Sequence, residues 1–445
     1  MTIRSVAGIV LTLALASCAT PTPDPVEPTP GLRAFVGARL VIGTTGTSGS
    51  AAAGGHVIEN GSLVTRDGRI EAVGPADEIE LPSDAEVIDV TGSTIIPGLI
   101  NAHGHVNDVR GLESDPSFYT EEHVVRQLTQ YARYGVTTVL SLGSGGTAGI
   151  VVRDLRDDDA RHARLYLSGP VVTADSPAEA ADRVNAVADM GVDIIKIRVD
   201  DNLGAATKMS PEVYQAVIEQ AHSRGLRVAA HVYYLEDAKR LLEANVDFIA
   251  HSVRDQPVDD ALVSLLTEHD VCYCPTLMRE VSTFVYAERP DWFDDPFFLG
   301  GVDPAVVASL EQPTYQKTVR DRPSAQTYRE GLPLAQRNLK ALADRGVRIA
   351  MGTDSGPAAR FQGYFEHGEL ELMAEAGLSP LQVIASATGE AARCLQVDDT
   401  IGTLEVGKWA DFVVLGGNPL EDIRHTRAIQ SVWIAGSELP GSYGN

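Results

Sequence analysis

Between residues 97 and 396 the chain repeats one pattern, in which a short apolar run is followed by a longer amphipathic stretch. Short apolar runs bounded by polar residues are typical of buried strands, and the longer stretches have helical periodicity. Eight β/α units in succession predict an α/β fold, a (β/α)8 TIM barrel, with its chemistry at the carboxyl ends of the strands. The predicted strands are residues 98–102, 136–142, 165–171, 193–199, 227–231, 247–251, 271–275 and 347–351.

The two ends of the chain have a different pattern. Residues 32–96 alternate short apolar runs with turns, and Asp67-Gly68 between two of these runs is a strong hairpin signal. Strand-like runs return in residues 397–440. We therefore expect residues 32–96 plus 397–440 to form a small β-sandwich domain beside the barrel of residues 97–396.

One connection in the predicted barrel is much longer than the others. Residues 279–329 follow the seventh predicted strand and are rich in Asp, Pro and aromatic residues. This length far exceeds that of an ordinary loop, and the position allows the segment to cover the barrel mouth. We interpret it as a lid that contributes substrate contacts, with a purely structural insertion as the alternative.

The N-terminus has the pattern of a targeting segment. Arg4 precedes an apolar run that is too short to span a bilayer and that ends in Leu15-Ala-Ser-Cys18, which resembles a bacterial lipobox. We predict a lipoprotein signal peptide in residues 1–18, a lipid on Cys18 and an extended Pro-rich tether in residues 19–31. An ordinary secretion signal is the alternative. The Ala after Cys18 predicts anchoring in the outer membrane, on its periplasmic face.

Composition narrows the partners and the redox chemistry. A net charge of -25 argues against nucleic acid and leaves a small-molecule substrate as the expected partner, with a homo-oligomer left open. Apart from Cys18, the cysteines are Cys272, Cys274 and Cys394. Because Cys272 and Cys274 are too close along one strand to bridge, we predict no disulfide framework.

Side chains that can bind metal ions stand at the ends of several predicted strands. His103 and His105 are two residues apart, so both imidazoles share one face of the first strand. Imidazole and carboxylate ligands suit zinc, manganese, cobalt or iron. A random chain with 11 His would rarely place four of them at strand ends. The full set of candidates is His103, His105, Lys196, His231, His251 and Asp354.

These motifs resemble the amidohydrolase superfamily, in its imidazolonepropionase-like and Xaa-Pro dipeptidase-like branch. The resemblance covers nearly the whole chain after the signal peptide. It rests on Ile96-Pro-Gly-Leu-Ile-Asn-Ala-His-Gly-His105, on Gly352-Thr-Asp-Ser-Gly356 and on residues 402–415. It implies two divalent metal ions, one held by His103, His105 and Asp354 and the other by His231 and His251, with Lys196 bridging them as a CO2-derived carbamate.

The chemistry of these ligands is consistent with that implication. A lysine ammonium has no lone pair, so Lys196 is a ligand only as a carbamate. The alternatives are a salt bridge from Lys196 to Asp200 or Asp201, a single-ion site, and a merely capping role for Asp354. Zinc is the expected ion. Two ions would share a bridging hydroxide at neutral pH, and Asp354 would act as general acid and base.

Three further residues are candidates for substrate contacts. Tyr233 lies two residues past His231 and is expected to hydrogen-bond the developing oxyanion, as in the related dipeptidases. Arg198 is a candidate for binding a substrate carboxylate, and His367 for lining the pocket. The alternatives are packing for Tyr233, pairing with Asp200 for Arg198, and a plain helix position for His367.

Together these features predict an exported, metal-dependent amidohydrolase. The expected substrate contains a C–N bond in an amide, a dipeptide, an N-acyl amino acid or a cyclic amide. A lactonase or phosphotriesterase would use the same centre, because the same hydroxide attacks those groups. The alternative that is not an enzyme is a metal- or solute-binding lipoprotein.

Overall fold

The computed structural model describes residues 31–45, 56–156 and 161–441. The predicted signal peptide, Cys18 and nearly all of the predicted tether lie outside the described residues. No helix within the described ranges is both long and apolar enough to cross a membrane.

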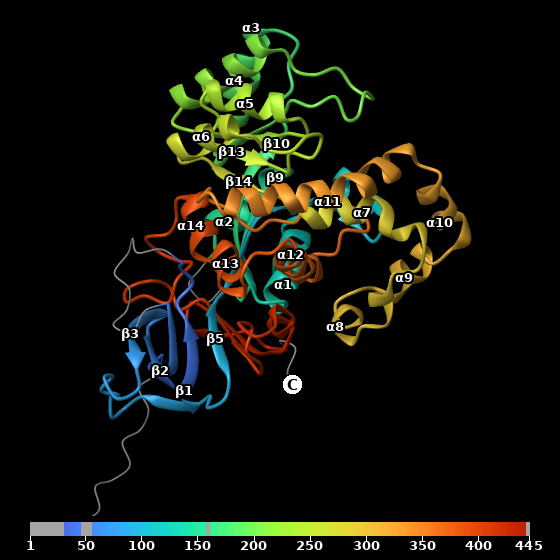
Figure 1. The fold of residues 1–445 in the computed structure, drawn as a ribbon. Helices are drawn as coiled ribbons and strands as arrows, with labels where there is room; N and C mark the ends of the chain where they lie inside the picture. Colours follow the sequence, from blue (N-terminus) through green and yellow to red (C-terminus); the bar gives the residue numbers. More distant parts are fainter. Residues whose placement is uncertain (1–30, 46–55, 157–160, 442–445) are drawn as a thin grey trace, which may run out of the picture.

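Strands from both ends of the chain pair in one sheet, whose β1, β2, β3 and β5 are the blue strands of Figure 1. Strand β5 pairs antiparallel with β15, so the C-terminal strands extend the sheet begun by the N-terminal ones. The β2–β3 hairpin turns at Asp67-Gly68, and both residues have positive φ, as the hairpin signal predicts. A second packed sheet, as in a sandwich, stays a prediction. The strands are β1 (Arg33–Val41), β2 (Val57–Arg66), β3 (Arg69–Pro75), β4 (Glu86–Asp89), β5 (Thr94–Pro97), β15 (Phe412–Leu415), β16 (Ile429–Ile434) and β17 (Ser437–Glu438).

Between these ends, parallel strands alternate with helices. The first seven of the predicted strands are present, within a few residues of their expected bounds. They form a three-stranded sheet, β10-β9-β6, and a four-stranded sheet, β11-β12-β13-β14. The strands are β6 (Leu99–Gly104), β9 (Val136–Gly143), β10 (Arg164–Pro170), β11 (Ile194–Arg198), β12 (Arg227–His231), β13 (Phe248–Ala250) and β14 (Cys272–Cys274).

Helices occupy the connections between these strands. The helices of the regular units are α1 (Glu121–Arg133), α2 (Thr147–Asp154), α3 (Pro177–Ala188), α4 (Pro211–Ser223), α5 (Leu235–Glu243) and α6 (Asp260–Glu268). After residues 347–351 come α12 (Tyr364–Glu375), α13 (Pro380–Ser386) and α14 (Gly389–Leu395). A two-stranded hairpin of β7 (Val109–Arg110) and β8 (Glu113–Ser114) precedes α1.

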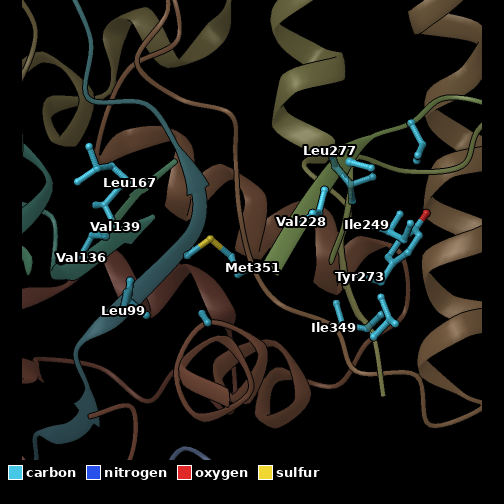
Figure 2. Packing of buried hydrophobic residues seen from close by; sticks show 14 of the residues in the cluster. Leu99, Val136, Val139, Leu167, Val228, Ile249, Tyr273, Leu277, Ile349 and Met351 are labelled. Atoms are coloured by element: carbon cyan, nitrogen blue, oxygen red, sulfur yellow. The ribbon is translucent and has the colours of Figure 1, made fainter. Parts of the chain in front are cut away.

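Single contacts connect the two parallel sheets and the eighth predicted strand. Val172 forms a parallel bridge with Ile197, next to the end of β10. Residues 347–351 bridge β14 through Ile349 and Tyr273, and the Met351 carbonyl accepts a hydrogen bond of 2.9 Å from the Ala102 amide in β6. The eighth segment therefore lies between the last and the first of the parallel strands. Figure 2 shows buried side chains from these segments packing together.

The long connection after β14 is helical. Residues 279–329 contribute most of α7 (Leu277–Phe284), all of α8 (Pro296–Leu299), α9 (Pro304–Leu310) and α10 (Pro313–Arg320), and the start of α11 (Pro323–Ala343). Helices α8 to α10 form an arm that extends beside the strands (Figure 1). Phe298 of the arm is buried in a cluster with Tyr134 and Phe365, and the half-buried Phe297 and Tyr315 pack against this cluster. The segment is thus a packed arm, and its closing over the site stays a prediction.

The prediction of no disulfide is wrong. Cys272 in β14 is bonded to Cys394 in α14, and Cys274 is buried and free. Sequence reasoning tested only the two cysteines that are neighbours in the chain. The fold instead brings together two cysteines that are 122 residues apart.

The disulfide gives a thiol count that can be measured. Protein lacking residues 1–18 and made in an oxidising compartment should expose one reactive thiol on denaturation without reductant, and none in a Cys274→Ala variant. Cys394→Ser should lower the free energy of unfolding by about 2–4 kcal/mol, because the unfolded chain loses a cross-link. Three reactive thiols in the unreduced protein would contradict the bond.

Candidate metal centre

The six predicted ligands lie in the parallel strands or shortly after these strands and the segment of residues 347–351. His103 lies in β6, Lys196 in β11 and His231 at the end of β12, while His251 directly follows β13. The imidazole ring centroids of His103 and His251 are 4.6 Å apart, and those of His231 and His251 are 4.1 Å apart. The strands therefore bring histidines from distant parts of the sequence to one place.

His103, His105 and Asp354 form the tightest group. One possible ligand atom from each residue lies within 4.8 Å of the others. Asp354 Oδ1 is 2.5 Å from His105 Nε2 and 3.6 Å from His103 Nε2. The Nδ1 atom of His105 lies 3.0 Å from the Ser144 hydroxyl, which fixes the orientation of the ring. Two imidazoles and a carboxylate in this arrangement are able to hold one divalent ion.

His231 and His251 are each oriented by a neighbour. His231 Nε2 lies 3.1 Å from Asp200 Oδ2, and His251 Nδ1 lies 2.7 Å from the Thr276 hydroxyl. Such partners fix the ring and the tautomer of a metal-binding histidine. Burial lowers the pKa of His231 to about 4, against the opposing effect of Asp200, and lowers the pKa of His251 well below its usual value. Both rings are therefore neutral near pH 7, the form that binds metal ions.

Lys196 is the least satisfied member of the set. The residue is only 3% exposed, and its Nζ atom has no hydrogen-bond partner within the described part of the chain. Burial lowers its pKa to about 8, although Asp354 opposes the shift. Asp200 is bound to Arg198 and His231, and Asp201 accepts a hydrogen bond from Tyr234. The two suggested salt-bridge partners of Lys196 are thus engaged elsewhere.

The backbone around the ligands is unusual. Asp354, His251 and Thr276 have φ values of 57°, 74° and 51°, in the left-handed region that residues other than glycine rarely adopt. Non-glycine residues in this region cost free energy and tend to lie at functional sites. A Cβ atom at Gly356 would lie 2.3 Å from the His105 carbonyl oxygen, so the close approach of the two segments requires glycine there.

Glu366 is a residue that sequence reasoning missed. It is fully buried in α12, and its carboxylate accepts hydrogen bonds of 2.5 Å from Asn101, 2.7 Å from Thr353 and 2.7 Å from Ser355. The Gly363 amide donates a fourth, of 2.6 Å. Burial raises the pKa of Glu366, and the hydrogen bonds oppose this shift. Glu366 therefore connects the strand that carries His103 with the segment that carries Asp354.

Two arginines from the connections lie close to Asp354. Its Oδ2 atom is 2.6 Å from Arg360 Nη1 and 3.8 Å from Arg279 Nε. Burial alone would raise the pKa of Asp354, but Arg360 and His105 hold it well below its usual value. The carboxylate is therefore ionised at neutral pH. No pattern in the sequence distinguished these two arginines from others in long connections.

Two of the three residues predicted to contact substrate form hydrogen bonds within the fold instead. Arg198 Nε donates a hydrogen bond of 2.8 Å to Asp200, the pairing given as its alternative. His367 is buried, and its two ring nitrogens lie 3.0 Å from the Thr426 hydroxyl and 2.9 Å from the Tyr134 carbonyl oxygen. Both nitrogens are thus used within the fold, which favours a plain helix position for His367. Tyr233 lies under the Arg254 guanidinium, with Cζ 4.5 Å from the ring centroid.

The role of Glu366 predicts the effect of a conservative change. Glu366→Gln replaces an acceptor oxygen by an NH2 group, which faces hydroxyl and amide donors and leaves buried groups unpaired. We expect the free energy of unfolding to fall by about 1–3 kcal/mol. Metal affinity should fall as well, because His103 and Asp354 lose their common support. Thermal unfolding and metal titration of this variant and of Glu330→Gln, an exposed change in α11, would measure both. Equal metal affinity in both variants would contradict a positioning role.

Comparison with known proteins agrees with this geometry. The sequence profile of the amidohydrolase family matches residues 94–439. The imidazolonepropionase of Symbiobacterium thermophilum is 24% identical over 408 residues, covering 81% of this chain and 84% of the relative. An uncharacterised protein of Mycobacterium tuberculosis is 26% identical over 350 residues, covering 74% and 80%.

Solved structures of similar proteins share this fold. A putative prolidase from Bifidobacterium longum superposes with a TM-score of 0.70 at 27% identity, covering 93% of this chain and 94% of the other. A Xaa-Pro dipeptidase with bound methionine has a TM-score of 0.71 at 22% identity, with 92% and 99% covered. The chain therefore belongs to the amidohydrolase family, in the imidazolonepropionase-like and Xaa-Pro dipeptidase-like branch, and is a hydrolase that acts on carbon–nitrogen bonds.

Proposed function

We propose that the protein hydrolyses the C–N bond of an amide, a dipeptide, an N-acyl amino acid or a cyclic amide at a centre of two divalent metal ions. The observation that carries the proposal is the grouping of His103, His105 and Asp354 within 4.8 Å, beside a buried lysine without a partner in the described ranges. Relatives named imidazolonepropionase and ochratoxinase support this reaction class over lactone or phosphotriester hydrolysis.

The donor set fits two ions. His103, His105 and Asp354 would hold one ion, His231 and His251 the other, and Lys196 would bridge them as a carbamate. Lys196 Nζ is buried without a hydrogen-bond partner among the described residues, and this arrangement would engage it. Zinc is the expected ion, with manganese, cobalt or iron as alternatives. When bound, such ions act as Lewis acids and lower the pKa of water towards about 7.

The protein's own residues would move the proton and orient the ligands. Asp354 would take a proton from the attacking water and deliver it to the leaving amine, as a general base and then a general acid. Arg360 would keep Asp354 ionised for the first of these steps. Asp200 and Thr276 would hold His231 and His251 in one orientation. Tyr233 is a candidate donor to the developing oxyanion.

We also infer that the parallel strands close into a (β/α)8 barrel. Three contacts support this inference, namely the bridge of Val172 with Ile197, the bridge of Tyr273 with Ile349, and the hydrogen bond between Ala102 and Met351. Together with the two sheets, these contacts would link the eight segments into one ring. In such a barrel the six candidate ligands share one mouth.

We further propose that the protein is exported and held by a lipid on Cys18 at the periplasmic face of the outer membrane. The disulfide between Cys272 and Cys394 supports export, because such bonds persist mainly in oxidising compartments. The lipid anchor rests on the lipobox-like sequence at Cys18.

The proposed reaction predicts the effect of removing the acid–base carboxylate. Asp354→Asn should lower kcat/KM on any substrate amide by about 100-fold or more, since it removes proton transfer as well as a ligand. The control is Asp321→Asn, an exposed aspartate paired with Lys317, which should retain wild-type activity. Turnover at the wild-type rate in Asp354→Asn would remove this residue from the mechanism.

The proposed carbamate predicts a change in metal content. Lys196→Ala should bind one ion fewer than the wild type and should lose the carbamate signal in the 13C NMR spectrum after growth with labelled bicarbonate. The exposed control, Lys317→Ala, should keep both ions. Elemental analysis makes the comparison, and two ions per chain in Lys196→Ala would overturn the bridging role.

A further inference from the structure

Two buried arginines lie beside the candidate metal centre and share one carboxylate. Arg254 follows His251 by three residues, while Arg279 and Glu280 lie in α7, just after β14. Arg254 is 2% exposed, Arg279 is 7% exposed and Glu280 is fully buried. Glu280 lies 3.2 Å from Arg254 Nε and 3.3 Å from Arg279 Nη1. One carboxylate thus faces two guanidinium groups.

The donors of these arginines are incompletely satisfied. The Nε and Nη2 atoms of Arg254 and the Nε atom of Arg279 are buried and have no hydrogen-bond partner in the described part of the chain. The contacts with Glu280, and that of Arg279 with Asp354 at 3.8 Å, are longer than the usual charge-assisted bonds of about 2.7–2.9 Å. Unpaired charged donors are costly to bury. A group that accepts hydrogen bonds and carries negative charge would complete this arrangement.

Aromatic residues hold the two guanidinium groups in place. Arg279 Nη2 donates a hydrogen bond of 3.1 Å to the Tyr328 hydroxyl, and its Cζ atom is 4.3 Å from the Tyr328 ring centroid. Arg254 lies over the ring of Tyr233. Arg279 and Tyr328 come from the two ends of the insertion of residues 279–329. The insertion therefore supplies both parts of this contact.

Arg279 lies close to the candidate metal centre. Its Nε atom is 3.8 Å from Asp354 Oδ2, the carboxylate proposed to transfer the proton. A group bound by Arg279 would thus lie next to the bond that is cleaved. The whole chain has a net charge of -25, so an anionic substrate needs local positive charge in order to bind.

We propose that Arg279 binds the free carboxylate of the substrate and so selects N-acyl amino acids and dipeptides over the corresponding amides that lack a carboxylate. This proposal rests on the proposed function and narrows it. The planar guanidinium is suited to a carboxylate because it offers parallel N–H donors. Arg254 and Glu280 are positioning residues, which hold Arg279 through the shared carboxylate. Tyr328 orients Arg279 from the other side.

Matched substrate pairs test the proposal with the metal-loaded full-length protein. The pairs are the N-acetyl and glycyl derivatives of L-proline, L-leucine, L-phenylalanine and L-arginine, each with a free carboxylate and as the C-terminal carboxamide. The wild type should prefer the acids in kcat/KM by about 30-fold or more, as expected when a buried charge pair is lost. Arg279→Gln should shrink this ratio at least tenfold, mainly through KM, and Arg279→Lys should retain part of it.

Control variants separate recognition from folding. Arg289→Gln removes an exposed arginine from the same insertion, where it pairs with Asp294 and Glu311, and should keep the wild-type ratio. Thermal unfolding and metal content should be measured for every variant. If Arg279→Gln does not fold, Tyr328→Phe, which removes the hydroxyl that accepts from Arg279, should reduce the acid preference while keeping the ring.

The outcomes distinguish this inference from the proposed function. Equal kcat/KM for acids and carboxamides in the wild type would overturn the role of Arg279 and leave the hydrolase intact. An unchanged ratio in a folded, metal-loaded Arg279→Gln protein would also overturn it. No hydrolysis of any acid or carboxamide, with the metal ions bound, would count against the proposed function itself.

Discussion

A single buried carboxylate connects the first and last parallel segments of this protein. Glu366 accepts four hydrogen bonds, three from the side chains of Asn101, Thr353 and Ser355 and one from a backbone amide. A carboxylate is costly to bury unless donors surround it, so the fold is stable only with these segments in register. The same contacts hold His103 beside Asp354. The geometry of the candidate centre thus depends on a residue that touches none of its proposed ligands.

The strands and the connections contribute different groups to the candidate site. The candidate ligands lie in the parallel strands or in the residues that follow the parallel segments. The connections supply positive charge, since Arg360 and Arg279 both approach the same oxygen atom, Oδ2, of Asp354. The long insertion after β14 thus brings its first residue, Arg279, next to Asp354.

Sequence periodicity located the strands and the candidate ligands because both are local signals. Each ligand stands at the end of an apolar run, and parallel strands bring such ends together. Long-range contacts gave no comparable signal. The disulfide joins Cys272 to a residue in the last helix. Glu366 accepts a hydrogen bond from Asn101, although the two residues are far apart in the sequence. In the same segment, His367 has the more recognisable functional side chain, but its neighbour Glu366 makes the contacts that connect the ligand-bearing segments.

We propose that divalent ions bound by the ligands in and after the parallel strands make this chain a C–N hydrolase. The most direct measurement is titration of the chelator-stripped wild-type protein with zinc or manganese, with amide hydrolysis and ion binding followed in the same sample. We expect no hydrolysis without metal, and a rise in activity that parallels the binding of up to two ions per chain. Hydrolysis by the stripped protein, or full occupancy without hydrolysis of any amide, would contradict it.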